Sequence, residues 1–130
     1  MSIPFDTRVL VVDDFESMRR IVGQLLRDMG FRDVTLADDG ATALALLRQD
    51  DFGLLLTDWH MPQMDGLDLV RAVRADPRLN AIPILMVSAE ATREQIIEAV
   101  RAGVNGYVVK PFTPQILSAK IGKLFESPAR

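Results

Sequence analysis

The stretch Val9-Leu10-Val11-Val12-Asp13-Asp14 is a short, continuous apolar run that ends in two carboxylates. Four further runs rich in Val, Ile and Leu follow at regular intervals, at Val34–Ala37, Leu54–Leu56, Ile84–Val87 and Tyr107–Val109. Continuous rather than alternating apolar residues are typical of strands that are buried on both faces. The five runs therefore predict five parallel strands.

Segments with helical periodicity separate these runs. The apolar positions that mark the five helices are Met18, Ile21, Val22, Leu25, Leu26 and Met29; Ala43, Leu44 and Leu47; Leu67, Leu69, Val70 and Val73; Ile96, Ile97 and Val100; and Ile116, Leu117, Ile121 and Leu124. Gly30 and Gly103 end the first and fourth helices, and the third stops before Pro77. The alternation predicts an α/β fold of the doubly wound, flavodoxin-like (βα)5 type, with a parallel five-stranded sheet in the order 2-1-3-4-5.

Length and composition limit the classes of protein to which the chain can belong. The 130 residues suit one domain, so we expect a single domain over 1–130 with a core of about 7–126 and no effector domain. A net charge of −3 argues against a nucleic-acid partner. The absence of cysteine and the single His60 exclude thiolate catalysis and multi-histidine metal sites. No apolar run could span a bilayer and no signal-peptide pattern is present, so we expect a cytoplasmic monomer without membrane insertion.

Polar residues stand directly after four of the predicted strands. They are Asp13 and Asp14 after the first, Asp58 after the third, Ser88 after the fourth and Lys110 after the fifth. Right-handed crossovers bring the C-terminal ends of parallel strands to one edge of the sheet, so these side chains should meet there. In the order 2-1-3-4-5 the winding reverses between the first and third strands, which carry all three aspartates.

The expected cluster combines groups that suit phosphoryl transfer. Three neighbouring carboxylates need protons or a cation, and Mg²⁺ binds one or two carboxylates together with water and phosphoryl oxygens. A lysine supplies a compact positive charge to a phosphate, and a serine hydroxyl can donate a hydrogen bond to it. A carboxylate can itself attack phosphorus and form an acyl phosphate. The pattern predicts Mg²⁺-assisted phosphorylation of an aspartate, and spacing alone leaves open which aspartate it is.

Three motifs resemble the receiver domains of two-component response regulators. They are Val11-Val12-Asp13-Asp14-Phe15, Thr57-Asp58-Trp59-His60-Met61-Pro62-Gln63-Met64-Asp65-Gly66 and Gly106-Tyr107-Val108-Val109-Lys110-Pro111-Phe112. The resemblance extends over nearly the whole chain, and it is strongest to the single-domain chemotaxis regulators of the CheY family. It implies that Asp58 accepts a phosphoryl group from a histidine kinase. It also implies that Asp14 and Asp58 bind Mg²⁺ directly, together with the main-chain carbonyl of His60, and that Asp13 does so through water.

The resemblance also implies a switch and an output surface. Lys110, joined to Pro111 by a cis bond, would pair with the phosphoryl group. Ser88 would bond it after a small inward shift, and Tyr107 would follow from an outward to an inward position. The partner surface would be the face of the fourth helix, fifth strand and fifth helix, with Ala91, Ile96, Tyr107, Val109 and Lys120.

The implied protein is a signalling module, and its only catalysis would be its own phosphorylation and dephosphorylation. The expected partners are a chemotaxis histidine kinase and the flagellar motor switch protein, and the sequence leaves open whether a phosphatase also acts. Alternatives are a phosphate sink, a receiver of a non-chemotaxis phosphorelay, and a phosphohydrolase with an aspartate nucleophile. A hydrolase of the haloacid dehalogenase class would need an aspartate two residues after the nucleophile, where this chain has His60.

Several residues have simpler interpretations. The aspartates that follow the first and third strands could be N-caps of the next helices, although this would leave the doubled acid and the lysine unexplained. For Asp38-Asp39-Gly40 we favour the cap interpretation, because the second strand is expected at the edge of the sheet. Arg19-Arg20 is interpreted as a solvated helix face, and Trp59 as a partly exposed packing residue.

His60 and Glu90 stand two positions after Asp58 and Ser88, respectively. In receiver domains the side chains at these positions flank the path of the water that hydrolyses the phosphoryl group. An imidazole and a carboxylate could approach each other across this entrance and so modulate dephosphorylation. We expect the reaction to quicken as the pH rises through the titration of His60, since a neutral imidazole would leave the path freer. A solvated histidine without such a role is the alternative.

Overall fold

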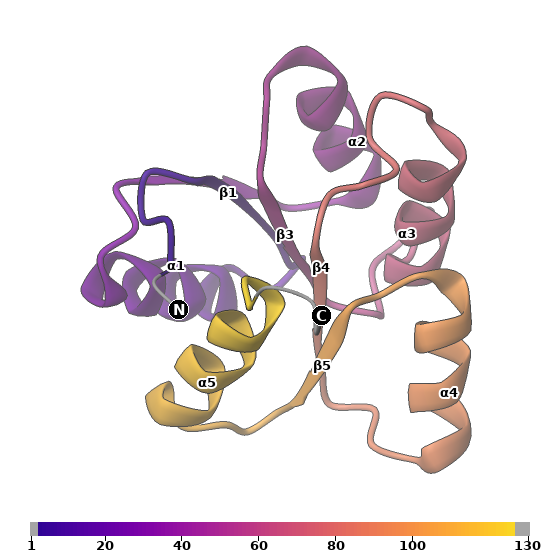
Figure 1. Ribbon diagram of the computed structural model, residues 1–130. Coiled ribbons are helices and arrows are strands. Elements are labelled where there is room, and N and C mark those ends of the chain that lie inside the picture. Colours follow the sequence, from indigo (N-terminus) through magenta and orange to yellow (C-terminus); the bar gives the residue numbers. More distant parts are fainter. Residues whose placement is uncertain (1–2, 127–130) are drawn as a thin grey trace.

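The structure is a computed structural model that describes residues 3–126, and it consists of a parallel sheet with helices on both faces (Figure 1). The elements in chain order are β1 (Arg8–Val12), α1 (Glu16–Met29), β2 (Asp33–Ala37), α2 (Gly40–Gln49), β3 (Leu54–Thr57), α3 (Gly66–Ala75), β4 (Ile84–Ser88), α4 (Arg93–Ala102), β5 (Gly106–Val109) and α5 (Pro114–Leu124). The strands pair in the order β2-β1-β3-β4-β5, and every neighbouring pair is parallel. The predicted fold class and strand order are confirmed.

The register of the sheet decides which residues lie side by side at its C-terminal edge. Val12 of β1 pairs with Thr57 of β3, so Asp13 and Asp58 follow from adjacent strands at the same level. Ser88 is the last residue of β4 and pairs with Val109 of β5. Lys110, which follows Val109, therefore lies next to Ser88. The candidate residues that follow four of the strands thus lie together at the C-terminal edge of the sheet.

Two hydrophobic cores lie on opposite faces of the sheet. Side chains alternate along β1, so Val9 and Val11 belong to one core and Leu10 and Val12 to the other. Helices α1 and α5 cover the first core, and α2, α3 and α4 cover the second (Figure 1). Burial on both faces explains why the inner strands β1, β3 and β4 are almost continuously apolar. Among the described residues, no helix is long and apolar enough to cross a membrane.

Four residues predicted on the apolar helix stripes are exposed instead. They are Ile21 of α1, Ile97 and Val100 of α4 and Ile116 of α5, which are 51%, 37%, 56% and 47% exposed, respectively. In α4 the fully buried residue is Ala99, and Ile96 packs partly against the same core. Residues at adjacent positions of a helix point about 100° apart. When Ile96 and Ala99 face the sheet, Ile97 and Val100 must therefore point away from it.

The segment between β3 and α3 folds back closely against the end of β3. The amide of Gly66 donates to the carbonyl of Trp59 at 2.7 Å, and a Cβ atom at Gly66 would overlap the carbonyl oxygen of Asp58. Asp65 then begins α3 through a capping box with Asp68. A glycine is required at position 66 because only it allows this close approach. The segment holds Asp58 and His60 at the C-terminal edge of the sheet.

Candidate functional site

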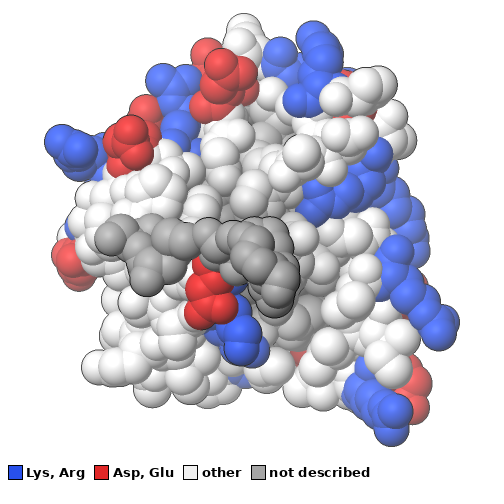
Figure 2. All heavy atoms as spheres, in the orientation of Figure 1, with Lys and Arg blue, Asp and Glu red and all other residues white. Residues whose placement is uncertain are grey.

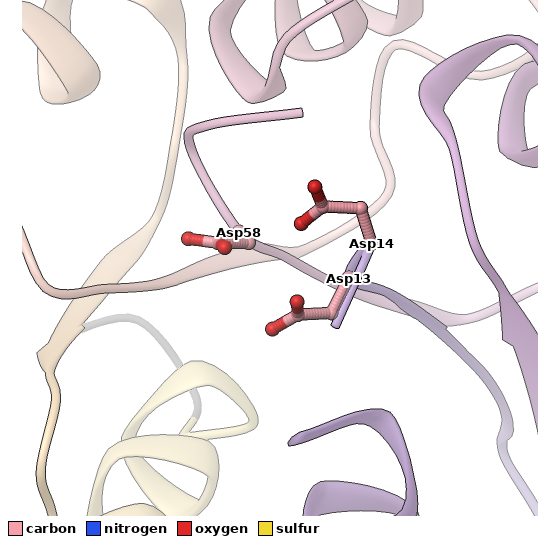
Figure 3. Close-up of side chains that lie close together, drawn as sticks. All are labelled: Asp13, Asp14 and Asp58. Atoms are coloured by element: carbon pink, nitrogen blue, oxygen red, sulfur yellow. The ribbon is translucent and has the colours of Figure 1, made fainter. Parts of the chain in front are cut away.

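Asp13, Asp14 and Asp58 meet at the ends of β1 and β3 (Figure 3). One carboxylate oxygen from each residue lies within 4.8 Å of the other two. The three side chains extend from the two neighbouring strand ends toward the same space (Figure 3). Asp13 is buried, Asp14 is exposed and Asp58 is intermediate, so the cluster opens to solvent on the side of Asp14.

Lys110 links two of these carboxylates. Its Nζ donates to Oδ2 of Asp13 at 2.9 Å and lies 3.4 Å from Oδ2 of Asp58. The second oxygen of Asp13, Oδ1, accepts a hydrogen bond from the amide of Phe15 at 2.9 Å. The peptide bond between Lys110 and Pro111 is cis, as predicted. One ammonium group therefore stands against three carboxylates, and the site carries an excess of negative charge.

The Asp58 carboxyl is shielded from water and fixed by the main chain. Its side chain is 14% exposed, and its Oδ1 accepts a hydrogen bond from the amide of Trp59 at 2.7 Å. Burial raises the pKa of Asp58, Lys110 opposes this rise, and the negative charge of Asp13 adds to it. A cation in the cluster would favour the ionised form of Asp58.

The donor set fits a hard divalent cation. Carboxylate oxygens are the ligands that Mg²⁺ prefers, and it keeps several waters, for which the open side at Asp14 leaves access. Asp13, Asp14 and Asp58 are the residues here that could hold Mg²⁺.

Ser88 and Tyr107 lie on neighbouring strands and share a partner in Glu90. Ser88 is buried, and its Oγ accepts a hydrogen bond from the amide of Glu90 at 3.1 Å. The Tyr107 hydroxyl donates to the carbonyl of Glu90 at 2.7 Å, and its ring belongs to the core under α3 and α4. Burial raises the pKa of the Tyr107 hydroxyl. The tyrosine is therefore in an inward position in this structure.

His60 and Glu90 approach each other, as the sequence predicted. His60 Nε2 lies 3.1 Å from Glu90 Oε2, and the two residues come from the segments that follow β3 and β4. The imidazole is exposed, and it stacks on the indole of Trp59 with ring centroids 6.1 Å apart. Trp59 itself is only 6% exposed, so the interpretation of it as a partly exposed residue is wrong. Its indole completes the core beneath the site because the segment after β3 folds back.

The interpretation of Arg19-Arg20 as a solvated helix face is corrected for Arg19 and holds for Arg20. Arg19 is not a purely solvated residue, because its Nη1 donates to the carbonyl of Asp13 at 2.7 Å. Arg20 does lie on the exposed face, where it pairs with Glu16 at 2.9 Å. The contact of Arg19 was missed because only the turn of α1 brings position 19 back over the end of β1. The doubled acid and the arginine six positions later are the signal that could have indicated it.

The helix caps decide between the two interpretations of the aspartates. The N-cap of α1 is Phe15, and the N-cap of α3 is Asp65. The clustered aspartates are therefore not caps. In α2, by contrast, Asp39 is the N-cap and accepts a hydrogen bond from the amide of Thr42 at 2.7 Å, as predicted.

The predicted partner face is only partly accessible in this structure. Ala91 and Lys120 are exposed, Val109 is 37% exposed, Ile96 is partly buried and Tyr107 is buried. Three large apolar side chains on α4 and α5 that the sequence did not assign to this face are also exposed, namely Ile97, Val100 and Ile116. Charge is unevenly spread over the molecule: Figure 2 shows basic side chains gathered on the side where α3 and α4 lie.

The comparisons with known proteins agree with the site and the fold. The response regulator receiver domain family matches residues 9–122. The chain belongs to this family, whose members are signalling proteins rather than classical enzymes.

The relatives point to one branch of the family. Chemotaxis protein CheY of Pseudomonas aeruginosa is 62% identical over 119 residues, which is 92% of this chain and 96% of that protein. Chemotaxis protein CheY-3 of Vibrio cholerae is 57% identical over the same share of the chain and 92% of its own length. The solved structure of Vibrio cholerae CheY4 superposes with a TM-score of 0.86 at 36% identity and covers 92% of this chain and 98% of that one. The chain is a CheY-like receiver domain, consistent with two-component signalling in chemotaxis.

Proposed function

We propose that the chain is a CheY-like response regulator in which Asp58 accepts a phosphoryl group from a histidine kinase with the help of Mg²⁺. The observation that carries this proposal is the meeting of three carboxylates with Lys110 at one edge of the sheet. Burial, the amide of Trp59 and the lysine all act on Asp58, whereas Asp14 is exposed and Asp13 is already bonded on both oxygens. Asp58 is therefore the carboxylate best placed to react.

In the proposed reaction a carboxylate oxygen of Asp58 attacks the phosphorus of a phosphohistidine. The new O–P bond forms as the P–N bond breaks, and the electron pair of that bond leaves with the histidine nitrogen. Lys110, held between Asp13 and Asp58, would neutralise the oxygens of the transferred group. Mg²⁺, when bound, would supply further positive charge at the same oxygens. Ser88 would donate a hydrogen bond to one of them.

Hydrolysis of the acyl phosphate would end the signal. Water attacks the phosphorus, the O–P bond to Asp58 breaks, and inorganic phosphate leaves. We propose that His60 and Glu90 flank the path of this water, since their side chains meet at 3.1 Å and come from the segments that follow Asp58 and Ser88.

The proposed output is binding of a partner to the face of α4, β5 and α5. The names of the relatives support chemotaxis, which makes a chemotaxis histidine kinase and the flagellar motor switch the proposed partners. Ser88 and Tyr107 would connect the site to this face, because both are hydrogen-bonded to Glu90 in the segment between β4 and α4.

The test is incubation with acetyl phosphate and Mg²⁺ followed by intact mass spectrometry. We expect a single phosphoryl adduct that requires Mg²⁺ and is removed by hydroxylamine, as an acyl phosphate is. Asp58→Asn should abolish the adduct, whereas Asp39→Asn, which changes the other doubled acid, should leave it intact. An unchanged adduct in Asp58→Asn would show that another residue is the acceptor.

A further inference from the structure

Glu90 is the residue on which contacts from four parts of the chain converge. Its amide donates to Ser88 Oγ at 3.1 Å, and its carbonyl accepts from the Tyr107 hydroxyl at 2.7 Å. Its carboxylate lies between two side chains: Oε2 is 3.1 Å from Nε2 of His60, and Oε1 accepts a hydrogen bond from Nε2 of Gln95. The main chain of Glu90 thus contacts β4 and β5, and its side chain joins the segment after β3 to α4.

Gln95 has two separate tasks in this arrangement. Its side-chain Oε1 accepts hydrogen bonds from the main-chain amide and the hydroxyl of Thr92, at 3.2 and 2.8 Å. The main-chain amide of Gln95 in turn donates to Thr92 Oγ1. This is a capping box at the start of α4. The cap holds the Gln95 side chain in place, and its remaining group, the Nε2 amide, points to Glu90.

The contact between His60 and Glu90 would be weak without Gln95. The His60 side chain is 66% exposed and that of Glu90 is 29% exposed, and an ion pair between exposed groups contributes little because water competes for both. A hydrogen bond from a helix-anchored amide removes much of the conformational freedom of the carboxylate. A connected network of this kind is worth more than its separate pairs.

We propose that Gln95 is a positioning residue that holds the Glu90 carboxylate against His60 and so closes the water path to the Asp58 phosphoryl group. This inference rests on the proposed function, and it adds a third residue, on α4, to the two that flank the path. The three side chains, His60, Glu90 and Gln95, form one bridge from the phosphorylation site to the first turn of α4.

The variant Gln95→Glu breaks this bridge and spares the helix cap. The introduced carboxylate keeps an oxygen for Thr92, as in the commonest form of the capping box, but it has no N–H to donate and repels Glu90. We expect autodephosphorylation, followed by intact mass after removal of acetyl phosphate, to become about fivefold faster, the factor that corresponds to about 1 kcal/mol of barrier. Gln115→Glu adds the same charge to the first turn of α5 and should leave the rate unchanged.

Exchange of the two groups gives a rescue that a merely structural role would not produce. In the double variant Glu90→Gln with Gln95→Glu, the amide at position 90 can donate to position 95 and its oxygen can still accept from His60. In the Glu90→Gln background, Gln95→Glu should therefore change the rate of autodephosphorylation by less than about twofold. Because the chain has a single histidine, its imidazole resonances need no assignment. They should shift in Gln95→Glu and return in the double variant.

Two results overturn the inference. If Gln95→Glu is phosphorylated normally and dephosphorylates at the wild-type rate, the bridge does not control the water path. If the rate rises equally in both backgrounds, Gln95 acts through the stability of α4 and not through Glu90. If the wild-type protein forms no phosphoryl adduct, the proposed function itself is refuted. The proposed role of Gln95 in the lifetime of the phosphorylated state is then refuted as well.

Discussion

Replacement of Asp58 by asparagine should make the protein more stable, although it removes the proposed acceptor. The side chain introduced by Asp58→Asn keeps an oxygen for the amide of Trp59, so the hydrogen bond at 2.7 Å can remain. What is lost is a negative charge that lies beside Asp13 and Asp14 and is largely shielded from water. The variant therefore separates the electrostatic cost of the site from its packing.

The distances give the size of the effect. At an effective dielectric constant of about 20, two carboxylates with oxygens within 4.8 Å of each other repel by at least about 3.5 kcal/mol. The attraction of Lys110, 3.4 Å from Asp58, amounts to about 5 kcal/mol on the same scale. The repulsion from the two neighbouring carboxylates therefore exceeds the attraction of Lys110 by at least about 2 kcal/mol. For a domain of this size, we expect Asp58→Asn to raise Tm at neutral pH by about 8 °C.

The dependence on pH follows from the raised pKa of Asp58. A carboxyl whose pKa is higher in the folded than in the unfolded state binds its proton more tightly when folded. Its contribution to the free energy of unfolding is therefore complete below the ordinary pKa of Asp, about 3.9, and is lost as the pH rises through the raised value. The difference in free energy of unfolding between Asp58→Asn and wild type should be small near pH 3 and grow toward neutral pH.

The assay is thermal and urea unfolding of the two proteins at several pH values in the absence of divalent cations. Added Mg²⁺ should narrow the gap at neutral pH, because the wild type binds it more tightly and gains RT ln(1 + [Mg²⁺]/Kd). Asp39→Asn is the matched control, since Asp39 caps α2 and the pKa of its carboxyl is lowered by the amide of Thr42. Equal stability of wild type and Asp58→Asn at neutral pH, or a gap that does not change with pH, would refute the reasoning.

Three further predictions concern the metal, the switch and the fold. Mg²⁺, followed by Trp59 fluorescence, should bind in the millimolar range, and Asp14→Ala should weaken it more than Asp39→Ala; equal effects would contradict the placement of the site. Ser88→Ala should still be phosphorylated by acetyl phosphate but lose phosphate-dependent binding to the motor switch, and full retention of that binding would exclude the coupling. Gly66→Ala should lower the free energy of unfolding in urea by about 3 kcal/mol, because its Cβ overlaps the carbonyl of Asp58; a loss below about 1 kcal/mol would show that the segment relaxes easily.

Local patterns in the sequence were enough to predict the architecture. Continuous apolar runs such as Val9–Val12 encode burial on both faces, and Gly30 and Gly103, both with positive φ, mark the ends of helices. Parallel strands joined by right-handed crossovers have few possible arrangements, so the residues after the strands had to meet at one edge. The meeting of Asp13 and Asp58 could be predicted for this reason.

Packing at long range decided the features that the sequence left open. Trp59 is buried because the segment after β3 folds back against the core, which no local periodicity encodes. Arg19 contacts the carbonyl of Asp13, only six positions earlier, because the first turn of α1 brings it back over the end of β1. The choice between Ile96 and Ile97 for the buried side of α4 depends on how the helix is rotated against the sheet.

The inward Tyr107 and the bridge through Glu90 and Gln95 belong to the same class of features. Each depends on the rotamers of side chains that come from different strands and helices. A sequence pattern specifies which groups reach the edge of the sheet, because the period of strands and helices is local. It does not specify which of them bond to one another, because those contacts form only when the segments after β3 and β4 are packed side by side.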